Sequence, residues 1–264
     1  SKALRKLELE NKLRHALERG EFEVYYQAKK DFTSDEVVGM EALVRWNHPE
    51  LGLVSPMEFI PLAEESGLII PLGEWILQTA CRQSKILQDE NYNLRVSVNL
   101  STRQFQDTCL AGKIIRIIEE TGINPHNLEL EVTESVIMKN AETAVNILNE
   151  IRKAGVKISI DDFGTGYSSL GYLKRLPIDV LKIDKSFVQD ITNDPNDASM
   201  VMAIISLAHN LRLKIIAEGI ETAEQHKLLH LLRCDEWQGF LFSKPIAFES
   251  FRKLLLENKK KFDI

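Results

Sequence analysis

The distribution of apolar and polar residues along the chain predicts strands that alternate with helices over most of its length. Strand-like apolar runs occupy residues 94–100, 128–133, 156–160, 180–183 and 213–217, with a weaker run at 232–237. Helical stripes lie between these runs, as at Ala144, Ile147, Leu148 and Ile151 and at Val201, Ile204, Ile205, Ala208 and Leu211. We expect these stripes to be the core-facing sides of helices.

The first part of the chain has a different pattern. Residues 2–19 have the leucine spacing of an amphipathic helix, and Gly20 is its expected end. The strand-like runs 22–27 and 37–46 are joined by a polar segment that is too short for a parallel crossover, so they should pair antiparallel. Together with the later runs, this pattern predicts an α/β fold, a TIM-like (β/α)8 barrel with an antiparallel first strand.

Length and charge narrow the class of protein. The 264 residues suffice for one large domain, and no Pro/Gly/Ser-rich linker divides them. A formal net charge of -6 argues against binding a nucleic-acid polymer or an anionic membrane through bulk electrostatics. The one basic run, Lys259-Lys260-Lys261, is expected to be a solvated terminal tail. We therefore expect no nucleic-acid polymer and no direct membrane contact.

Cysteine usage and the first residue bear on the location of the protein. Cys81, Cys109 and Cys234 are widely spaced, without a Cys-x-x-Cys pattern, which indicates reduced thiols in a cytoplasmic domain. No apolar run is long enough to span a bilayer. The chain begins at Ser1 rather than Met, which suggests a domain excised from a longer protein that could be membrane-anchored.

Candidate chemistry lies within or just after successive strand-like runs. The pair Asp161-Asp162 follows the run 156–160 and precedes the glycine-rich Gly164-Thr165-Gly166. Polar residues in corresponding places are Glu41, Asn99, Glu131, Asp161, Lys182, Glu218 and Gln238. The C-terminal face of a barrel brings such positions together. Oxygen donors without a Cys/His set favour magnesium, manganese or calcium over structural zinc.

Seven motifs occur in order between Phe22 and Pro245. They are Glu41-Ala42-Leu43-Val44-Arg45-Trp46-Asn47-His48-Pro49, Ser97-Val98-Asn99-Leu100-Ser101, Glu131-Val132-Thr133-Glu134-Ser135, the 161–170 stretch, Lys182-Ile183-Asp184, Ala217-Glu218-Gly219-Ile220-Glu221-Thr222 and Gln238-Gly239-Phe240-Leu241-Phe242-Ser243-Lys244-Pro245. In this order the sequence resembles the EAL-domain family of cyclic di-GMP-specific phosphodiesterases. Two departures are Ala28 in place of a usual proline and Phe240 in place of a common tyrosine.

The resemblance implies a site for two divalent cations, Mg²⁺ or Mn²⁺, with Ca²⁺ expected to be inhibitory. Glu41, Asn99, Glu131 and Asp161 would hold one cation. Asp161, Asp162 and Glu218 would serve the second, with Asp161 bridging. Two cations about 3.5 to 4 Å apart can clamp a phosphodiester and activate a water.

The resemblance also implies catalytic and substrate-binding roles. Lys182 would position the attacking water, Gln238 would support it, and Glu218 would either bind metal or accept a proton. Residues expected to contact the substrate are Gln27, Arg45, the backbone of Leu43, and Asp184. Glu134 and Glu221 would order the 162–170 loop. By the same resemblance, the intact 163–170 loop suggests a homodimer surface coupled to the metal site.

These interpretations give an expected organisation and function. Residues 1–20 would form an N-terminal helix, which serves as a linker from an upstream regulatory domain or packs on the barrel. Residues 21–258 would form the EAL phosphodiesterase domain, and 259–264 a C-terminal tail. The expected reaction is hydrolysis of cyclic di-GMP to linear pGpG in bacterial second-messenger signalling. The alternatives are a catalytically silent cyclic di-GMP receptor and another metal-dependent barrel enzyme acting on a sugar phosphate or an enolisable acid.

Overall fold

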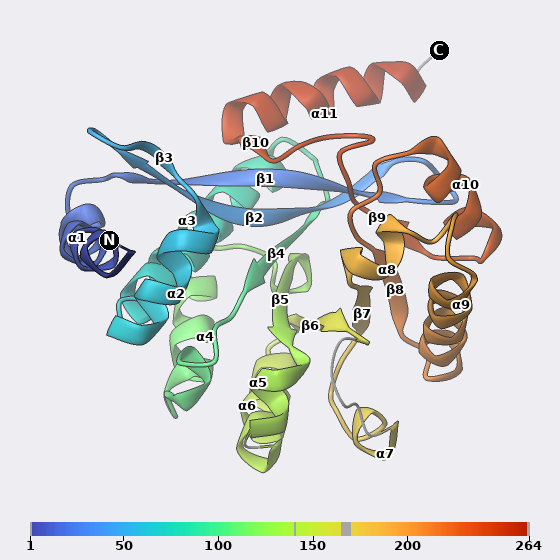
Figure 1. Ribbon diagram of the computed structural model, residues 1–264, viewed down its shortest axis with the longest axis horizontal. Coiled ribbons are helices and arrows are strands. Elements are labelled where there is room, and N and C mark those ends of the chain that lie inside the picture. The colour runs from blue at the N-terminus through green and yellow to red at the C-terminus, as the bar shows by residue number, and fades with distance from the viewer. Residues whose placement is uncertain (1, 140, 165–169, 263–264) are drawn as a thin grey trace.

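The computed structural model describes residues 2–139, 141–164 and 170–262, and its strands lie at the centre of the molecule (Figure 1). The strands are β1 Phe22–Asp31, β2 Val37–His48, β3 Gly52–Val54, β4 Arg95–Asn99, β5 Leu128–Thr133, β6 Lys157–Phe163, β7 Val180–Ile183, β8 Lys214–Ala217, β9 Glu236–Trp237 and β10 Ile246–Ala247. The helices are α1 Lys2–Ala16, α2 Pro56–Ser66, α3 Ile69–Asp89, α4 Leu110–Thr121, α5 Glu134–Lys139, α6 Ala141–Lys153, α7 Leu170–Leu173, α8 Lys185–Gln189, α9 Pro195–Asn210, α10 Ala223–Leu231 and α11 Phe248–Phe262, with short 3-10 turns at Gln104–Gln106 and Pro125–Asn127.

The strands form a closed barrel. Strands β2, β4, β5, β6, β7, β8 and β9 are parallel neighbours in that order. Strand β1 is antiparallel to both β2 and β9, so it closes the ring. The predicted TIM-like barrel with an antiparallel first strand is therefore confirmed. In the β1–β2 hairpin Gln27 lies opposite Glu41, which brings two predicted site residues together.

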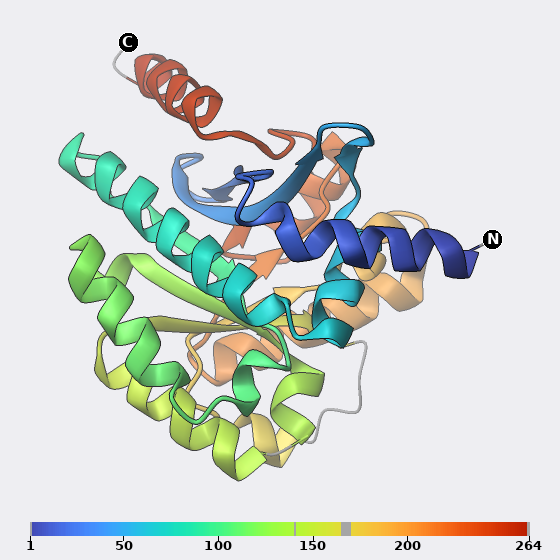
Figure 2. The same ribbon diagram turned by 90° about the vertical axis from the view of Figure 1, so that its left-hand side faces the viewer.

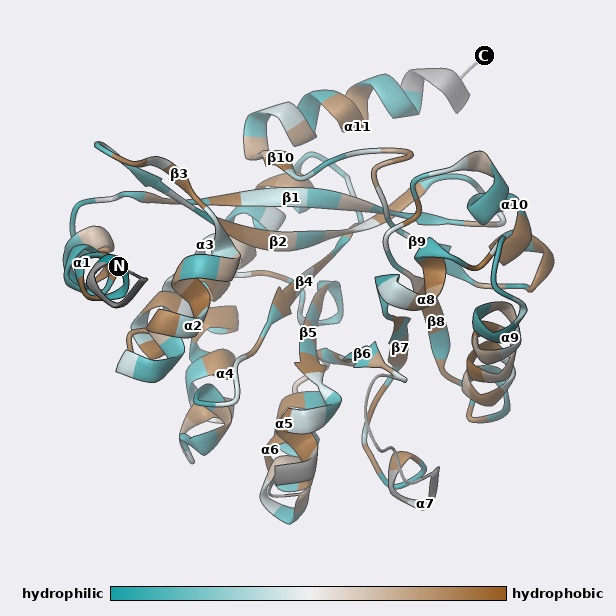
Figure 3. Ribbon diagram, in the orientation of Figure 1, coloured by the Kyte–Doolittle hydropathy of each residue, from teal (hydrophilic) through white to brown (hydrophobic). Residues whose placement is uncertain are grey.

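Alternate residues of each barrel strand face opposite environments. On β5, Leu128, Leu130 and Val132 belong to the hydrophobic core that the surrounding helices cover. Glu129 and Glu131 are equally buried but contact charged groups from other strands. Figure 3 shows hydrophobic colouring on β4, β5 and β8, while the helices carry hydrophilic colouring on part of their surface. The hydrophobic core thus lies between strands and helices.

Two terminal helices cover the β1–β2 hairpin. Leu9 and Leu13 of α1 join a second apolar cluster with Phe22 and Trp46. Along α11, Phe251 stands with its ring centroid 6.0 Å from that of Tyr26 on β1. Figure 2 shows the two helices on different sides of the hairpin. Among the helices of the described chain, none is long and apolar enough to cross a membrane.

The terminal helices differ in length from the predictions. Helix α1 ends at Ala16 rather than residue 19, and the chain turns through Gly20, whose φ of 67° favours glycine. Helix α11 continues to Phe262. Residues 259–262 of the predicted tail are therefore helical.

Two strand boundaries also differ from the predictions. The run predicted at 232–237 is a strand only at Glu236–Trp237, because the chain leaves α10 through Arg233 at a φ of 64°. Strand β6 extends beyond residue 160 to Phe163, so the aspartate pair lies within a strand. The pairing of β6 with β7 shifts register between Ile160 and Phe163, which is a β-bulge.

Candidate metal and catalytic site

Predicted site residues from seven barrel strands converge at one end of the barrel. Glu41 lies on β2, Asn99 ends β4, Glu131 lies on β5, Asp161 lies on β6, Lys182 lies on β7, and Glu218 and Gln238 follow β8 and β9. Parallel strands direct their carboxyl ends to the same face of a barrel. The strand order therefore places side chains that are distant in sequence within hydrogen-bonding range.

Lys182 lies at the centre of this group and has no exposed side-chain surface. Its Nζ donates to Glu131 and lies 2.5 Å from Glu218 Oε1. Asp161 Oδ1 lies 3.3 Å from the same nitrogen, and Glu41 Oε2 lies 3.9 Å away. Four carboxylates from four strands thus surround one buried ammonium group.

Glu41 is held by two side-chain amides. Asn99 Nδ2 donates to Glu41 Oε1 at 2.9 Å, and Gln238 Nε2 donates to Glu41 Oε2 at 2.6 Å. Gln238 also lies 3.4 Å from Gln27 Oε1, while Gln27 Nε2 donates to the Ser243 carbonyl at 3.0 Å. The hydrogen bonds therefore connect the last strand to the first hairpin through predicted site residues.

Gly239 allows the backbone after β9 to approach the backbone of Ile220 closely. A Cβ added at Gly239 would lie 2.0 Å from the carbonyl oxygen of Ile220. Ile220 N donates to the Gln238 carbonyl at 3.2 Å, and Leu241 N donates back to the Ile220 carbonyl at 3.0 Å. Since only glycine fits between these backbones, Gly239 keeps Gln238 beside the segment that carries Glu218.

Asp162 lies on the β-bulge with a φ of 55°, in the left-handed region that Asp tolerates better than most residues. Its carboxyl group shares a hydrogen bond with Asp184, and burial, Asp161 and this bond raise the pKa of Asp162 to about 6. Asp184 also accepts hydrogen bonds from the Ser186 backbone and hydroxyl at the start of α8. The bulge therefore gives Asp161 and Asp162 different partners.

Four other predicted residues lie apart from the Lys182 group. Arg45 donates to the Val44 carbonyl at 3.0 Å and lies over the Tyr25 ring. Leu43 is half-buried and pairs with Tyr25 across the hairpin. Glu134 begins α5 with a buried Oε2, and Glu221 is exposed before α10. The loop that these glutamates are predicted to order includes residues 165–169, which lie outside the described residues.

Burial and charge have opposing effects on the pKa values of the site. Burial raises the pKa of Glu41 against the opposing charge of Lys182, and Glu131 raises it further. Burial also raises the pKa of Glu218 well above its usual range, again opposed by Lys182 and reinforced by Asp161. For Glu131, burial is outweighed by Lys182 and Lys29, which lower its pKa to about 2. The site therefore disfavours the ionised forms of Glu41 and Glu218, while Lys182 and Lys29 favour the ionised form of Glu131.

The donor set fits a hard divalent cation. It offers oxygen ligands from four carboxylates and the amide of Asn99, which suit magnesium, manganese or calcium. Within the described ranges, no three Asp, Glu, His or Cys side chains form a group arranged to hold a metal ion, and the carboxylates are grouped around Lys182 instead. A cation would favour the ionised forms of Glu41 and Glu218, which burial disfavours.

Sequence reasoning missed a second layer of polar and charged residues beneath this group. Lys29, Ser97, Glu129 and Glu236 are buried and lie two residues before or after Gln27, Asn99, Glu131 and Gln238. In a strand, residues two apart share a face. The period-two rule, applied to each predicted site residue, was the signal that would have found the layer.

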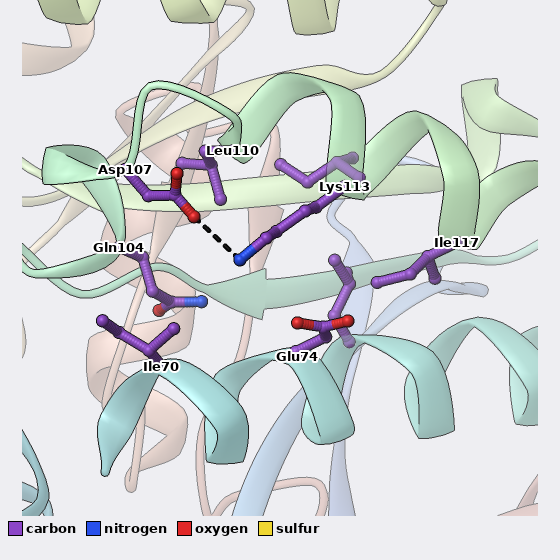
Figure 4. A pocket seen from close by; sticks show the side chains of 9 residues that line it. Ile70, Glu74, Gln104, Asp107, Leu110, Lys113 and Ile117 are labelled. Atoms are coloured by element: carbon purple, nitrogen blue, oxygen red, sulfur yellow. Dashed lines mark ion pairs between the residues drawn. The ribbon is translucent and has the colours of Figure 1, made fainter. Parts of the chain in front are cut away.

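A pocket between α3 and α4 lies outside this site (Figure 4). Apolar residues such as Leu77 and Ile117 line it, and Lys113 pairs with Asp107 at 2.8 Å. None of the predicted site residues lines it. The pocket therefore adds nothing to the candidate chemistry.

The chain matches the EAL domain family over residues 10–245. It is 45% identical over 248 residues to MucR of Pseudomonas aeruginosa, a bifunctional diguanylate cyclase/cyclic di-GMP phosphodiesterase, covering 94% of this chain and 36% of MucR. It is 42% identical over 252 residues to PdeR, a cyclic di-GMP phosphodiesterase of Escherichia coli strain K12, covering 94% of this chain and 38% of PdeR. The chain belongs to the EAL domain family, and the resemblance found in the sequence is confirmed.

A solved structure agrees with this assignment. The complex of the PaMucR phosphodiesterase with c-di-GMP has a TM-score of 0.90 and 44% sequence identity, covering 92% of this chain and 99% of that chain. The chain spans only 36% and 38% of the length of MucR and PdeR. Those relatives therefore contain further segments beyond the matched domain.

Proposed function

We propose that this chain is a metal-dependent phosphodiesterase that hydrolyses cyclic di-GMP to linear pGpG. MucR and PdeR are named for cyclic di-GMP phosphodiesterase activity, and the PaMucR structure contains c-di-GMP. The observation that carries the proposal is the group of four carboxylates around the buried Lys182 at the carboxyl ends of the barrel strands. In this fold, that face is where catalytic groups lie.

EAL phosphodiesterases use metal ions, and we propose Mg²⁺ or Mn²⁺ with two cations per site. Glu41, Asn99, Glu131 and Asp161 would hold one cation, while Asp161, Asp162 and Glu218 would hold the other. When bound, the cations supply a Lewis acid that polarises the phosphodiester and lowers the pKa of a water. Ca²⁺ shares the oxygen ligands but accepts a looser geometry, so it should bind and inhibit turnover.

The protein's own groups have separate roles in the proposed reaction. The Lys182 ammonium group stabilises negative charge that develops on the phosphoryl oxygens. Gln238 Oε1 is buried without a hydrogen-bond partner in the part of the chain that the structure describes, which supports a role in accepting a hydrogen bond from the attacking water. Glu218 has a raised pKa and offers the alternative role of proton acceptor.

Substrate recognition is assigned to the rim beside this group. The half-buried Arg45 presents a guanidinium suited to a phosphate. Gln27, the backbone of Leu43, and Asp184 would orient the guanine and ribose. Glu134 and Glu221 would order the 162–170 loop.

We propose a homodimer whose surface includes that loop, and an upstream regulatory domain joined through residues 1–20. Residues 21–258 would form the catalytic domain and 259–264 its tail. A cytoplasmic location suits the free, buried thiols of Cys81 and Cys234, which persist in reducing compartments.

Product chromatography tests the proposed reaction. The protein is incubated with cyclic di-GMP and Mg²⁺, Mn²⁺ or Ca²⁺, beside Glu41→Ala as the matched variant. We expect pGpG with Mg²⁺ and Mn²⁺, none with Ca²⁺, and none from the variant. If cyclic di-GMP stays uncleaved with every metal, by the wild type and the variant alike, the proposed phosphodiesterase activity is contradicted.

Calorimetry then separates the alternatives. Binding of cyclic di-GMP in Ca²⁺ without turnover in Mg²⁺ or Mn²⁺ identifies a silent receptor. A protein that neither binds nor cleaves cyclic di-GMP has a different substrate, such as a sugar phosphate or an enolisable acid.

A further inference from the structure

Lys29 is fully buried inside the barrel and makes three polar contacts. Its Nζ donates to Ser97 Oγ at 2.6 Å, to Glu131 Oε1 at 2.6 Å and to Glu129 Oε1 at 3.2 Å. An ammonium group has three N–H donors, so these contacts satisfy all of them. A buried lysine with every donor paired is a fixed structural element, unlike a solvated surface lysine.

The neighbours of Lys29 are themselves held in place. Ser97 Oγ accepts from Lys29 and donates to Glu129 Oε1 at 2.8 Å. Glu129 Oε2 lies 3.4 Å from Arg95 Nε, and Arg95 also pairs with Glu236. Glu236 in turn accepts from Lys214 Nζ at 2.8 Å. Together with Lys29, these residues form a network across the barrel, which we call the lower layer. The network fixes the position of the Lys29 ammonium group.

Glu131 joins the lower layer to the candidate site. One carboxylate oxygen, Oε1, accepts from Lys29, and the other, Oε2, accepts from Lys182. Both side chains are fully buried, so the carboxylate has no alternative contact with bulk water. With Oε1 held from below, only Oε2 faces the group of site carboxylates.

We propose that Lys29 is a positioning residue for Glu131, holding Oε1 so that Oε2 is presented to the metal. This inference rests on the proposed function, which makes Glu131 a metal ligand. Groups that orient a ligand are expected to affect metal affinity by about tenfold to a hundredfold when removed. Lys29 therefore acts on metal binding through Glu131 without touching the metal or the substrate.

Titration with Mn²⁺ alone, followed by electron paramagnetic resonance of the free ion, tests the proposal without measuring activity. Lys29→Met keeps the length of the side chain and removes the charge and donors. We expect its Mn²⁺ affinity to fall about tenfold. The matched control is Lys30→Met on the opposite face of β1, where Nζ pairs with Asp35 at 2.5 Å. This control should bind Mn²⁺ like the wild type.

The result separates positioning from two simpler roles. If Lys29→Met has an unchanged Mn²⁺ affinity and a lower unfolding temperature, Lys29 only stabilises the fold. If Lys29→Met binds Mn²⁺ more tightly than the wild type, Lys29 acts only as a charge that repels the cation. Either outcome overturns the proposal. If Lys29→Met does not fold, Ser97→Ala removes one of the contacts that fix Lys29 and should weaken Mn²⁺ binding about threefold, less than the loss expected for a group that contacts the ligand directly. Unchanged affinity there overturns it equally.

Glu131→Gln distinguishes a failure of this inference from a failure of the proposed metal site. Weaker Mn²⁺ binding in Glu131→Gln, with no further loss in the double variant with Lys29→Met, supports action through Glu131. Additive losses in the double variant contradict it. Unchanged binding in Glu131→Gln alone shows that Glu131 is not a metal ligand, which refutes the assignment beneath the inference.

Discussion

The two faces of the barrel strands are equally buried but chemically opposite. On β5, Leu130 and Glu131 are adjacent, and their exposed fractions are 0% and 1%. Leu130 packs among apolar side chains, whereas Glu131 lies between two ammonium groups. Burial alone therefore does not separate residues that stabilise the fold from residues that serve the site.

The difference lies in what burial does to each face. Burying an apolar side chain such as Leu130 stabilises the folded state by about 2 kcal/mol. Burying carboxylates disfavours their ionised forms, as the raised pKa values of Glu41 and Glu218 show. The outer face thus contributes the stability that offsets a concentration of charge on the inner face.

The largest expected effect comes from the inner face, with Glu41→Gln. Turnover of cyclic di-GMP should fall about a thousandfold, or about 4 kcal/mol in transition-state stabilisation, because the variant loses the carboxylate that we propose as a metal ligand. The unfolding temperature should stay the same or rise, because the raised pKa shows that the folded state disfavours this charge. Steady-state kinetics and thermal unfolding measure both. If Glu41→Gln lost stability but kept its turnover, Glu41 would serve the fold rather than the reaction, contrary to the difference between the two faces described above.

Met40→Ala, the neighbouring position on β2, should give the opposite result. Met40 is fully buried in the outer core, so its truncation should cost about 3 kcal/mol of unfolding free energy. Turnover per folded molecule should be unchanged. Urea unfolding with an unchanged m-value checks the stability loss. A drop in turnover comparable to that of Glu41→Gln would show that the two faces are not independent.

Glu134→Ala should have an intermediate effect. Glu134 begins the helix α5, which packs against the strand carrying Asp161 and Asp162, and its Oε2 is buried. Activity should fall about tenfold without unfolding, as for residues that support a metal site. Kinetics across a range of Mg²⁺ concentrations measure this, with Ser135→Ala at the exposed neighbouring position as the control. If Glu134→Ala has the same activity and the same Mg²⁺ dependence as the wild type, the proposal that the 162–170 loop controls the site is wrong.

Tyr26→Phe should have the smallest effect. Tyr26 Oη donates to Gln83 Oε1 at 2.5 Å on the helix side of β1, and loss of this hydrogen bond should cost about 1 kcal/mol. Turnover should not change. A double-mutant cycle with Gln83→Ala isolates the interaction in chemical unfolding. A change in kcat would show that the outer face of β1 also affects catalysis.

How much of the fold the sequence predicted depended on how far apart along the chain the interacting residues lie. Apolar runs predicted β5 and β7, and the short polar segment between two such runs predicted the β1–β2 hairpin, because these patterns are local. The prediction of a strand at 232–237 was mostly wrong. The first residues of this apolar run form the turn through Arg233, and only Glu236–Trp237 is a strand. The bulge at Asp162 was missed, since it depends on pairing between β6 and β7.

The sequence by itself determined the barrel, the antiparallel first strand and the strand ends that carry the polar residues of the candidate site, because each is encoded in local periodicity or in an ordered motif. Only the tertiary structure decided which charges meet. Lys29 lies far along the chain from Glu129 and Glu131, and their contact depends on barrel closure and strand register. A side chain within a closed barrel acquires its partners from every strand that faces it, and no local pattern specifies that set.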